Sequence, residues 1–302
     1  MSTKLLSGKE PAEELLKSIA SQAKKLDPKL VILQVGGLAE SNAYILAKVR
    51  ACERISLRCD HQNLLASITR DELIGIIESL NADSDVSGYI LQLPLPDLLW
   101  HDFPLITRAM DPKKDVDGFT AYNLGKLFIS KDFEHLPPAT PAGILLLLEH
   151  YGIGVEGKTA VIVGQSNLVG KPLSIMLKNR GATTINCDVH TPPDELRNLC
   201  KNHGDLLISA VGKPGLITKD MVKPGAVVID IGITRTDEGL MGDVDFDAVK
   251  ELASAITPVP GGVGPMTVAS LLRNVVRAKE RQSSPPSPSS VMPRSRAPMP
   301  LP

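Results

Sequence analysis

The stretch that decides the fold is Thr159-Ala-Val-Ile-Val163 followed by Gly164-Gln-Ser166-Asn-Leu-Val-Gly170-Lys-Pro172. The apolar run predicts a buried strand, and residues from about 169 to 179 predict a helix. Glycines in the connection let the backbone approach a phosphate, and the free N–H groups of the helix point toward it. Because the spacing differs from G-x-G-x-x-G, two interpretations stay open: a nucleotide site and an ordinary strand–helix connection.

The residues that follow this turn continue the same alternation. A strand is predicted over 183–187, which completes a βαβ unit, and further strand-like runs lie at 206–210 and 227–231. Asp188 follows the second strand, 24 residues after Gly164, where a carboxylate can bind ribose hydroxyls. A solvated turn residue is the alternative for Asp188. Together these features favour a nucleotide-binding sheet in the middle of the chain.

The residues before the turn predict a second α/β unit. Helices are predicted over 11–26, around 44–52 and over 70–80, with strands over 30–35 and 87–94. This alternation is typical of a parallel sheet covered on both faces. Residues 111–141 are rich in Asp, Lys, Pro and Gly, which predicts loops and a domain boundary near Pro137 and Pro138. A last helix is predicted over about 267–279, and the Ser/Pro-rich residues beyond Arg281 are predicted to be disordered.

Composition excludes several classes of protein. A chain of 302 residues is long enough for two domains with their own cores, and 43% hydrophobic and 22% charged residues are typical of a soluble globular protein. A net charge of −1 gives no bulk attraction to nucleic acid or anionic lipid, so neither a nucleic-acid nor a membrane partner is expected. Four cysteines without paired spacings predict neither a zinc site nor a disulfide framework, and no metal is expected. With no apolar run of about 20 residues, the sequence indicates a cytoplasmic protein.

Several polar residues of the first unit suggest a ligand site. Tyr44 and Lys48 are four residues apart and therefore share one helix face, an arrangement that suits a flat ligand or an ordinary surface pair. Gln92 lies in an otherwise apolar strand and must find a partner if it is buried. Asp115 and Asp117 lie in the following loop, where they are able to bind a ligand, cap a helix or, least favoured, contact a metal.

Over residues 3 to 280 the chain resembles the bifunctional methylenetetrahydrofolate dehydrogenase/methenyltetrahydrofolate cyclohydrolase family. The resemblance rests on seven motifs in order: Ser41-x-x-Tyr44-x-x-x-Lys48-x-x-Ala51, Gln92-Leu-Pro-Leu-Pro96, Lys114-Asp-Val-Asp-Gly-Phe119, Thr140-Pro-x-Gly143, Gly164-x-Ser-x-x-Val-Gly-x-Pro172, Gly242-Asp-Val-Asp245 and Ile256-Thr-Pro-Val-Pro-Gly-Gly-Val-Gly-Pro-Met-Thr267. It implies oxidation of 5,10-methylenetetrahydrofolate with NAD or NADP, then hydrolysis to 10-formyltetrahydrofolate. A monofunctional cyclohydrolase and a non-catalytic folate- or nucleotide-binding protein are the alternatives.

The resemblance also implies a domain organisation and a set of site residues. Residues 1–138 with 266–281 would form a folate-binding α/β domain and residues 139–265 a Rossmann-like NAD(P)-binding domain, with the active site in the cleft between them, a tail over 282–302 and a homodimer built through the middle domain. The implied catalytic residues are Lys48, its hydrogen-bonding neighbour Gln92, and Asp117, which would anchor the pterin. The implied substrate-binding residues are Tyr44, which would stack on folate, with Leu91, Leu93, Pro260, Gly261, Gly262, Val263 and Gly264. The implied cofactor-binding residues are Gly164, Gln165, Ser166, Asp188 and Ile233.

The nucleotide preference is where the sequence departs from the family habit, which is NADP. Members that use NADP often carry a basic residue at the position of Gln165, and a small hydroxyl or basic residue where Asp188 and Val189 stand here. A carboxylate beside the ribose would repel the additional phosphate and accept hydrogen bonds from free hydroxyls, which favours NAD. Lys171 and His190 are the residues able to reach that phosphate instead.

Overall fold

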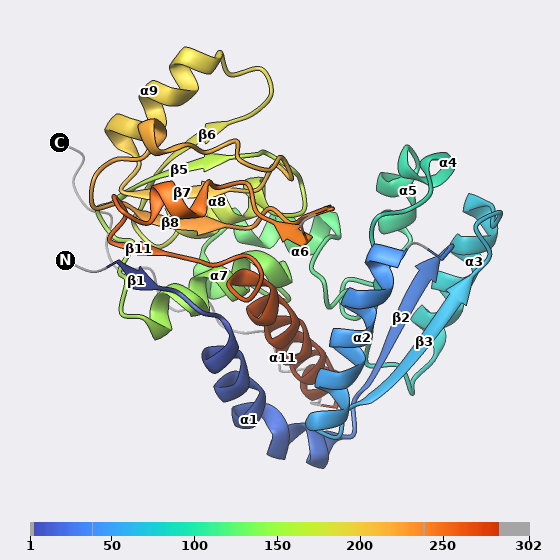
Figure 1. Ribbon diagram of the computed structural model, residues 1–302. Coiled ribbons are helices and arrows are strands. Elements are labelled where there is room, and N and C mark those ends of the chain that lie inside the picture. The colour runs from blue at the N-terminus through green and yellow to red at the C-terminus, as the bar shows by residue number, and fades with distance from the viewer. Residues whose placement is uncertain (1–2, 38, 238, 284–302) are drawn as a thin grey trace, which may run out of the picture.

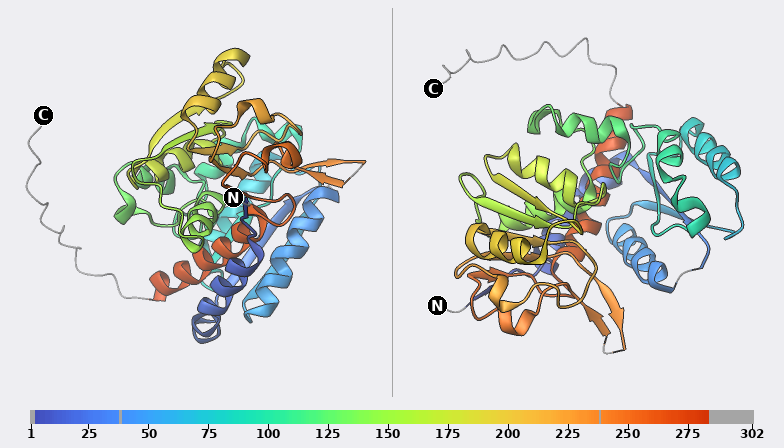
Figure 2. Two further views of the ribbon diagram at one scale, coloured as in Figure 1. Left: turned by 60° about the vertical axis from the view of Figure 1, so that its left-hand side comes forward. Right: turned by 90° about the horizontal axis from the view of Figure 1, so that it is seen from above.

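The computed structural model describes residues 3–37, 39–237 and 239–283, and it contains two α/β units, each built on a parallel sheet (Figure 1). The predicted two-domain α/β class is confirmed. The first sheet has three strands in the order β3-β2-β4, and the second has six in the order β1-β11-β8-β7-β5-β6. Seen from above, the units lie side by side, with the last helix, α11 (Val263–Ser283), between them (Figure 2).

The first sheet is covered on both faces because its central strand, β2 (Lys29–Val35), is mostly apolar and buried. Val31 and Leu33 point into a core with residues of α3 (Arg70–Ala82) and β4 (Gly88–Leu91). Leu30 and Ile32 point the opposite way, into a second core with α1 (Lys9–Leu26), α2 (Ala39–Arg54) and α11. Alternation along one parallel strand thus joins it to helices on both sides.

The outer strand of the first sheet, β3 (Arg58–Leu64), was not predicted from the sequence. It pairs with β2 in parallel over its whole length, from Arg58 opposite Lys29 to Leu64 opposite Val35. Its sequence, Arg-Cys-Asp-His-Gln-Asn-Leu, is mostly polar and half-exposed, as suits an edge strand, so no hydrophobic periodicity reveals it.

The second sheet follows the predicted βαβ pattern around β5 (Thr159–Val163). β6 (Thr183–Cys187) lies on one side of β5, and β7 (Leu206–Ser209) followed by β8 (Val227–Asp230) on the other. The strand order therefore reverses between β5 and β7, and in such sheets ligands bind at the carboxyl ends of the strands where this reversal occurs. Helices α7 (Ala139–His150) and α8 (Gly170–Lys178) cover one face of this sheet, and α9 (Pro193–His203) covers the other.

Residues 4 and 5 belong to the second sheet, although residues 1–138 were predicted to lie in the first unit. β1 (Lys4–Leu5) pairs in parallel with β11 (Ala255–Ile256), and the backbone N–H of Leu6 donates to the oxygen of Ile256 at 2.8 Å. Two residues are too few to show a strand pattern in sequence. The described chain therefore starts at the edge of the second sheet and crosses to the first unit through α1.

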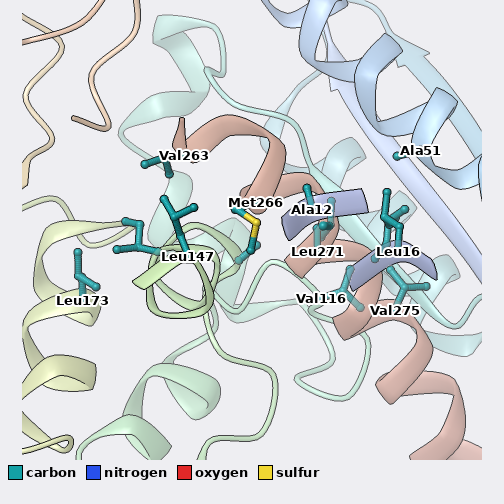
Figure 3. Close-up of a cluster of buried hydrophobic side chains, with 14 of the residues drawn as sticks. Ala12, Leu16, Ala51, Val116, Leu147, Leu173, Val263, Met266, Leu271 and Val275 are labelled. Atoms are coloured by element: carbon teal, nitrogen blue, oxygen red, sulfur yellow. The ribbon is translucent and has the colours of Figure 1, made fainter. Parts of the chain in front are cut away.

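Helix α11 is longer than predicted, and its side chains lie in one core with both units. Met266, Leu271 and Val275 on α11, Leu16 on α1 and Leu147 on α7 belong to this one cluster (Figure 3). The helix continues to Ser283, so Gln282 and Ser283, which were predicted to begin the disordered tail, are helical. Gln282 donates to the oxygen of Ser87 at 2.8 Å, which ties the end of α11 to the start of β4. Residues 284–302 of the predicted tail lie outside the described residues.

Short elements complete the structure. Residues 111–141, predicted as loops, also contain α6 (Ala121–Leu127) and the 3-10 helix η1 (Lys131–Phe133). The other short elements are α4 (Asp97–Trp100), α5 (Phe103–Arg108), the 3-10 helix η2 (Lys219–Met221), α10 (Phe246–Val249) and an antiparallel hairpin of β9 (Thr234–Thr236) and β10 (Gly239–Met241). None of the helices in the described parts of the chain is long and apolar enough to cross a membrane.

Candidate active site

Lys48 and Gln92 meet across the gap between α2 and the end of β4. The Nζ atom of Lys48 donates to Oε1 of Gln92 at 2.8 Å, and Nε2 of Gln92 donates to the oxygen of Leu93 at 2.7 Å. Gln92 is 8% exposed, so the buried amide has a partner at both ends. Because both amide atoms are engaged, Gln92 holds the Lys48 amine in one position.

Burial shifts the pKa of both Lys48 and Asp117 so that the neutral form of each is favoured. It lowers the pKa of Lys48, while the nearby carboxylate of Asp117 acts in the opposite direction. It also raises the pKa of Asp117 to about 6, with Asp115 adding to the rise and Lys48 opposing it. The pKa values of the lysine and of the carboxyl group are thus shifted toward each other, which is the direction that proton transfer requires.

The two aspartates of the loop after β4 have different surroundings. Asp115 is fully buried and accepts hydrogen bonds from the backbone of Gly118 and Thr120 at 2.9 and 2.8 Å and from Nδ2 of Asn123 at 2.9 Å. Among the described residues, none donates a hydrogen bond to the carboxylate of Asp117. Asp115 therefore fixes the loop, and Asp117 keeps its acceptors for a ligand.

The other predicted substrate-binding residues lie on three different elements. Tyr44 lies one turn before Lys48 on α2 and is 40% exposed. Leu91 ends β4 as a buried residue, and Leu93 beyond it is half-buried. The segment over 260–264, whose last two residues begin α11, contacts the start of α1, where the backbone N–H of Gly8 donates to the oxygen of Gly261 at 2.9 Å.

Val263 differs from the rest of the predicted substrate-binding set. Its side chain is buried in the same core cluster as Met266 and Leu147 (Figure 3). Only its backbone is therefore left for contact with a substrate.

A second group of hydrogen-bonded polar side chains in the first unit was not predicted from the sequence. Nε2 of Gln34 donates to Oδ1 of Asn42 at 2.9 Å, and Nε2 of His61 lies 2.8 Å from Oε1 of Gln34. Gln34 is buried near the carboxyl end of β2, and Asn42 lies near the start of α2. The sequence signal that could have identified this group is Gln34, a single polar residue in the otherwise apolar segment Leu30–Val35. The same kind of signal identified Gln92.

The glycine turn after β5 is closely packed. Gly164 has φ +104°, its N–H donates to Cys187 at 2.9 Å, and a Cβ atom there would lie 2.4 Å from the oxygen of Ala210. A Cβ atom at Gly170 would lie 1.8 Å from the oxygen of Gly164. Both positions therefore require glycine. Without side chains at these two positions, the backbone at the ends of β5, β6 and β7 can pack closely where the strand order reverses.

The remaining predicted cofactor residues surround this turn. The amide of Gln165 donates to the oxygens of Ile162 and Gly164 at 3.2 and 3.1 Å, and Oγ of Ser166 accepts from the N–H of Val169 at 3.1 Å. Asp188 is exposed after β6, and its Oδ1 accepts from the N–H of His190 at 2.9 Å. Ile233 is half-buried in the segment after β8. These residues all lie near the carboxyl ends of the strands, where a dinucleotide binds in sheets of this kind.

Two buried aspartates that sequence analysis did not single out brace this edge of the sheet. Asp230 accepts from the N–H groups of Gly232 and Asp243 at 3.0 Å each, and Asp243 accepts from Oγ of Ser209 at 2.8 Å. A Cβ at Gly232 would lie 2.0 Å from Asp243, and a Cβ at Gly242 would lie 2.0 Å from Asp230. Burial raises the pKa of Asp230 to about 6 despite these bonds. Two carboxylates and two glycines thus fix the loops beside Ile233.

Comparison with known proteins gives the same family for both units. Residues 6–117 match the model described as "Tetrahydrofolate dehydrogenase/cyclohydrolase, catalytic domain", and residues 138–283 match its "NAD(P)-binding domain". "Bifunctional protein FolD" of Agathobacter rectalis is 46% identical over 271 residues, covering 89% of this chain and 95% of that protein. The crystal structure of the bifunctional FolD enzyme from Campylobacter jejuni is 39% identical with a TM-score of 0.87, covering 93% of this chain and 99% of that one. The Trypanosoma brucei enzyme, described as complexed with NADP cofactor and inhibitor, is 30% identical with a TM-score of 0.88, covering 93% and 98%.

Proposed function

This chain belongs to the tetrahydrofolate dehydrogenase/cyclohydrolase family, and from that premise we propose that Lys48, Gln92 and Asp117 carry its chemistry. The protein is a bifunctional enzyme of one-carbon folate metabolism. It oxidises 5,10-methylenetetrahydrofolate to 5,10-methenyltetrahydrofolate with NAD(P), and it hydrolyses that product to 10-formyltetrahydrofolate. The observation that carries the residue assignment is the hydrogen bond of 2.8 Å between Lys48 and Gln92, with the carboxylate of Asp117 near enough to act on the pKa of Lys48.

The oxidation depends chiefly on positioning. When bound, the nicotinamide cofactor accepts a hydride from the carbon that bridges two folate nitrogens. The product is a delocalised cation, so this step needs no protein base. The turn over 164–172 fits the cofactor, because it places backbone N–H groups and the start of α8 where the strand order reverses. Tyr44 stacks on the folate ring system, and Asp117 accepts hydrogen bonds from the pterin.

The hydrolysis needs proton transfer, which we assign to Lys48. Water attacks the carbon of the methenyl cation and loses one proton, and the C–N bond then opens as its nitrogen receives a proton. The remaining hydroxyl proton leaves to solvent as the formyl C=O bond forms. A neutral amine can take the first proton and deliver the second, and burial lowers the pKa of Lys48 in the direction this requires. The cationic substrate disfavours protonated Lys48 further. Gln92 keeps the amine directed at the reacting carbon.

We propose NAD as the preferred cofactor of this chain. Asp188 stands exposed at the end of β6 with one carboxylate oxygen bound to the backbone of His190, and the amide of Gln165 is turned toward the backbone. A carboxylate here accepts hydrogen bonds from the ribose hydroxyls and repels the phosphate of NADP.

We further propose a homodimer formed through the second unit and a cytoplasmic location. The location is supported by the four cysteines, all of which are free thiols, as expected in a reducing compartment. The homodimer rests on the family resemblance. Sedimentation of the purified protein at several concentrations tests it.

The test of the residue assignment compares the wild-type enzyme with Lys48→Met. Oxidation of methylenetetrahydrofolate is measured with NAD and NADP in parallel, separating absorbance of the reduced nucleotide from that of methenyltetrahydrofolate, and hydrolysis of added methenyltetrahydrofolate is measured separately. Lys48→Met should abolish hydrolysis, whereas Lys24→Met, which removes an exposed lysine of α1, should not. A folded Lys48→Met enzyme that hydrolyses its substrate at the normal rate would refute the assignment.

A further inference from the structure

A cavity of about 570 Å³ lies away from the residues assigned to folate and nucleotide. It is lined by α7 and the turn after it, by the end of α8, by the second half of α11 and by the segment that follows η1. None of the residues assigned a catalytic, folate or cofactor role lines it. Its volume falls within the range of about 300–1,000 Å³ that is common for small-molecule sites.

The charged residues of this cavity leave two arginines without an acidic partner. Its wall contains Arg180, Arg273, Arg277, Glu134 and Glu149, which gives one net positive charge. Arg180 and Glu134 form a two-point ion pair with N–O distances of 2.7 and 3.0 Å, which neutralises both. Among the described residues, Arg273 and Arg277 form no ion pair, and the exposed Glu149 is the one carboxylate left in the wall.

Arg273 lacks both an ion-pair partner and a hydrogen-bond partner for its Nε atom among the described residues. This Nε atom is buried. Burial and the neighbouring Arg277 lower the pKa of Arg273 to about 10. Leaving a charged group partly buried and unpaired is costly, and an acidic group in the cavity would reduce the repulsion between the two guanidinium groups.

The remaining wall of the cavity is mostly apolar, which indicates the kind of ligand that it favours. Leu145, Leu148, Ile153, Val155 and Met176 contribute apolar side chains. Such a wall favours a ring or short hydrocarbon over a second polar group.

We propose that this cavity is a second binding site, which takes a small organic anion with an apolar body and a carboxylate or phosphate group paired to Arg273 and Arg277. The site is separate from the proposed active site and does not depend on the function assigned there. The four-residue spacing places both guanidinium groups on one face of α11, where they contact the same acidic group.

Isothermal titration calorimetry on the full chain, with NAD at saturation to occupy the turn over 164–172, tests the proposal with phenyl phosphate and benzoate as probes. We expect at least one of these anions to bind once per chain and phenol, the uncharged control, not to bind. Arg273→Met and Arg277→Met should each weaken the anion by about tenfold or more, because each removes a charged hydrogen bond. Arg108→Met, an exposed arginine of α5, should leave the affinity unchanged.

Two further variants distinguish anion binding in this cavity from binding at the active site and from misfolding. Arg273→Gln, which keeps an N–H donor at about the position of Nε but removes the charge and the Nη groups, should also weaken anion binding and serves if Arg273→Met does not fold. Lys48→Met should bind the probes normally, so a failed assignment of the active site does not affect the result. Absence of binding to the wild-type protein, or equal affinity in the Arg273 and Arg277 variants, would overturn the proposal. A second result would also overturn it: if the Arg273 and Arg277 variants changed their molar mass in light scattering and the wild-type protein bound no probe, the cavity would be a contact between copies of the chain.

Discussion

Replacing Asp117 by asparagine should make the free enzyme more stable while it destroys folate binding. The pKa of this carboxyl group is raised from 3.8 to about 6, chiefly by burial. Since a tenfold change in proton affinity corresponds to about 1.4 kcal/mol, holding Asp117 ionised costs the folded state about 2 to 3 kcal/mol above pH 7. Asparagine has nearly the same shape and cannot ionise, so Asp117→Asn avoids this cost.

The sign of the effect gives a specific pH dependence. Because the pKa of Asp117 is higher in the folded than in the unfolded chain, protonation favours folding, and the wild-type enzyme loses stability as pH rises from about 4 to about 6. The advantage of Asp117→Asn should therefore be close to zero near pH 3.5 and reach about 2 to 3 kcal/mol at pH 8. Its affinity for folate should fall in the same variant, since the pterin loses a charged acceptor.

Urea unfolding at a series of pH values measures this difference, followed by the fluorescence of Trp100, the single tryptophan, which lies on α4 in the first unit. Asp132→Asn, at an exposed position of η1, is the matched control and should change little at any pH. An Asp117→Asn protein no more stable than wild type at pH 8, or equally stabilised at pH 4 and pH 8, would refute the view that this carboxylate is held ionised at a cost.

Three other substitutions have defined outcomes. Asp188→Ser should raise the ratio of kcat/KM with NADP to that with NAD by about tenfold, because it removes a charge that repels the additional phosphate; an unchanged ratio in parallel assays contradicts the role assigned to Asp188. Gly170→Ala should abolish NAD binding in fluorescence titrations, since its Cβ would lie 1.8 Å from the oxygen of Gly164, whereas Gly125→Ala in α6, with no atom within 4 Å, should bind normally. Gln92→Leu should lower kcat for cyclohydrolase by about tenfold to a hundredfold with a smaller effect on KM, because the catalytic amine loses its orientation; a rise in KM alone would indicate a role in binding.

Strands with an apolar or β-branched sequence could be predicted, whereas the polar edge strand β3 and the two-residue strand β1 could not. The predicted strands at 159–163 and 183–187 match β5 and β6 to the residue, because apolar or β-branched runs between turn signals leave few alternatives. β3 and the two-residue β1 are stabilised by pairing with neighbouring strands rather than by their own periodicity. Such pairing depends on the tertiary arrangement, which local pattern does not contain.

The site shows a similar limit. Sequence singled out Lys48 and Gln92 separately, but their contact across 44 residues depends on the positions of α2 and β4 in the first unit. The local sequence pattern treated Asp115 and Asp117 alike, and the family resemblance pointed to Asp117. The hydrogen bonds of Asp115 give the physical reason, because they show that this buried aspartate fixes the loop. Spacing identifies candidate groups, whereas the environment decides which of them is reactive.

The crossed arrangement of Asp230, Asp243, Gly232 and Gly242 has a consequence for how this enzyme can change over evolutionary time. Each carboxylate occupies the space that a Cβ atom of one glycine would need, so a side chain at either glycine displaces the opposite aspartate. Single substitutions at these four positions should therefore be rejected, and accepted changes should arrive in compensating pairs, Asp243 with Gly232 and Asp230 with Gly242. A library that randomises one position at a time would describe this loop as immutable, whereas one that varies each pair together would reveal which alternatives the fold accepts.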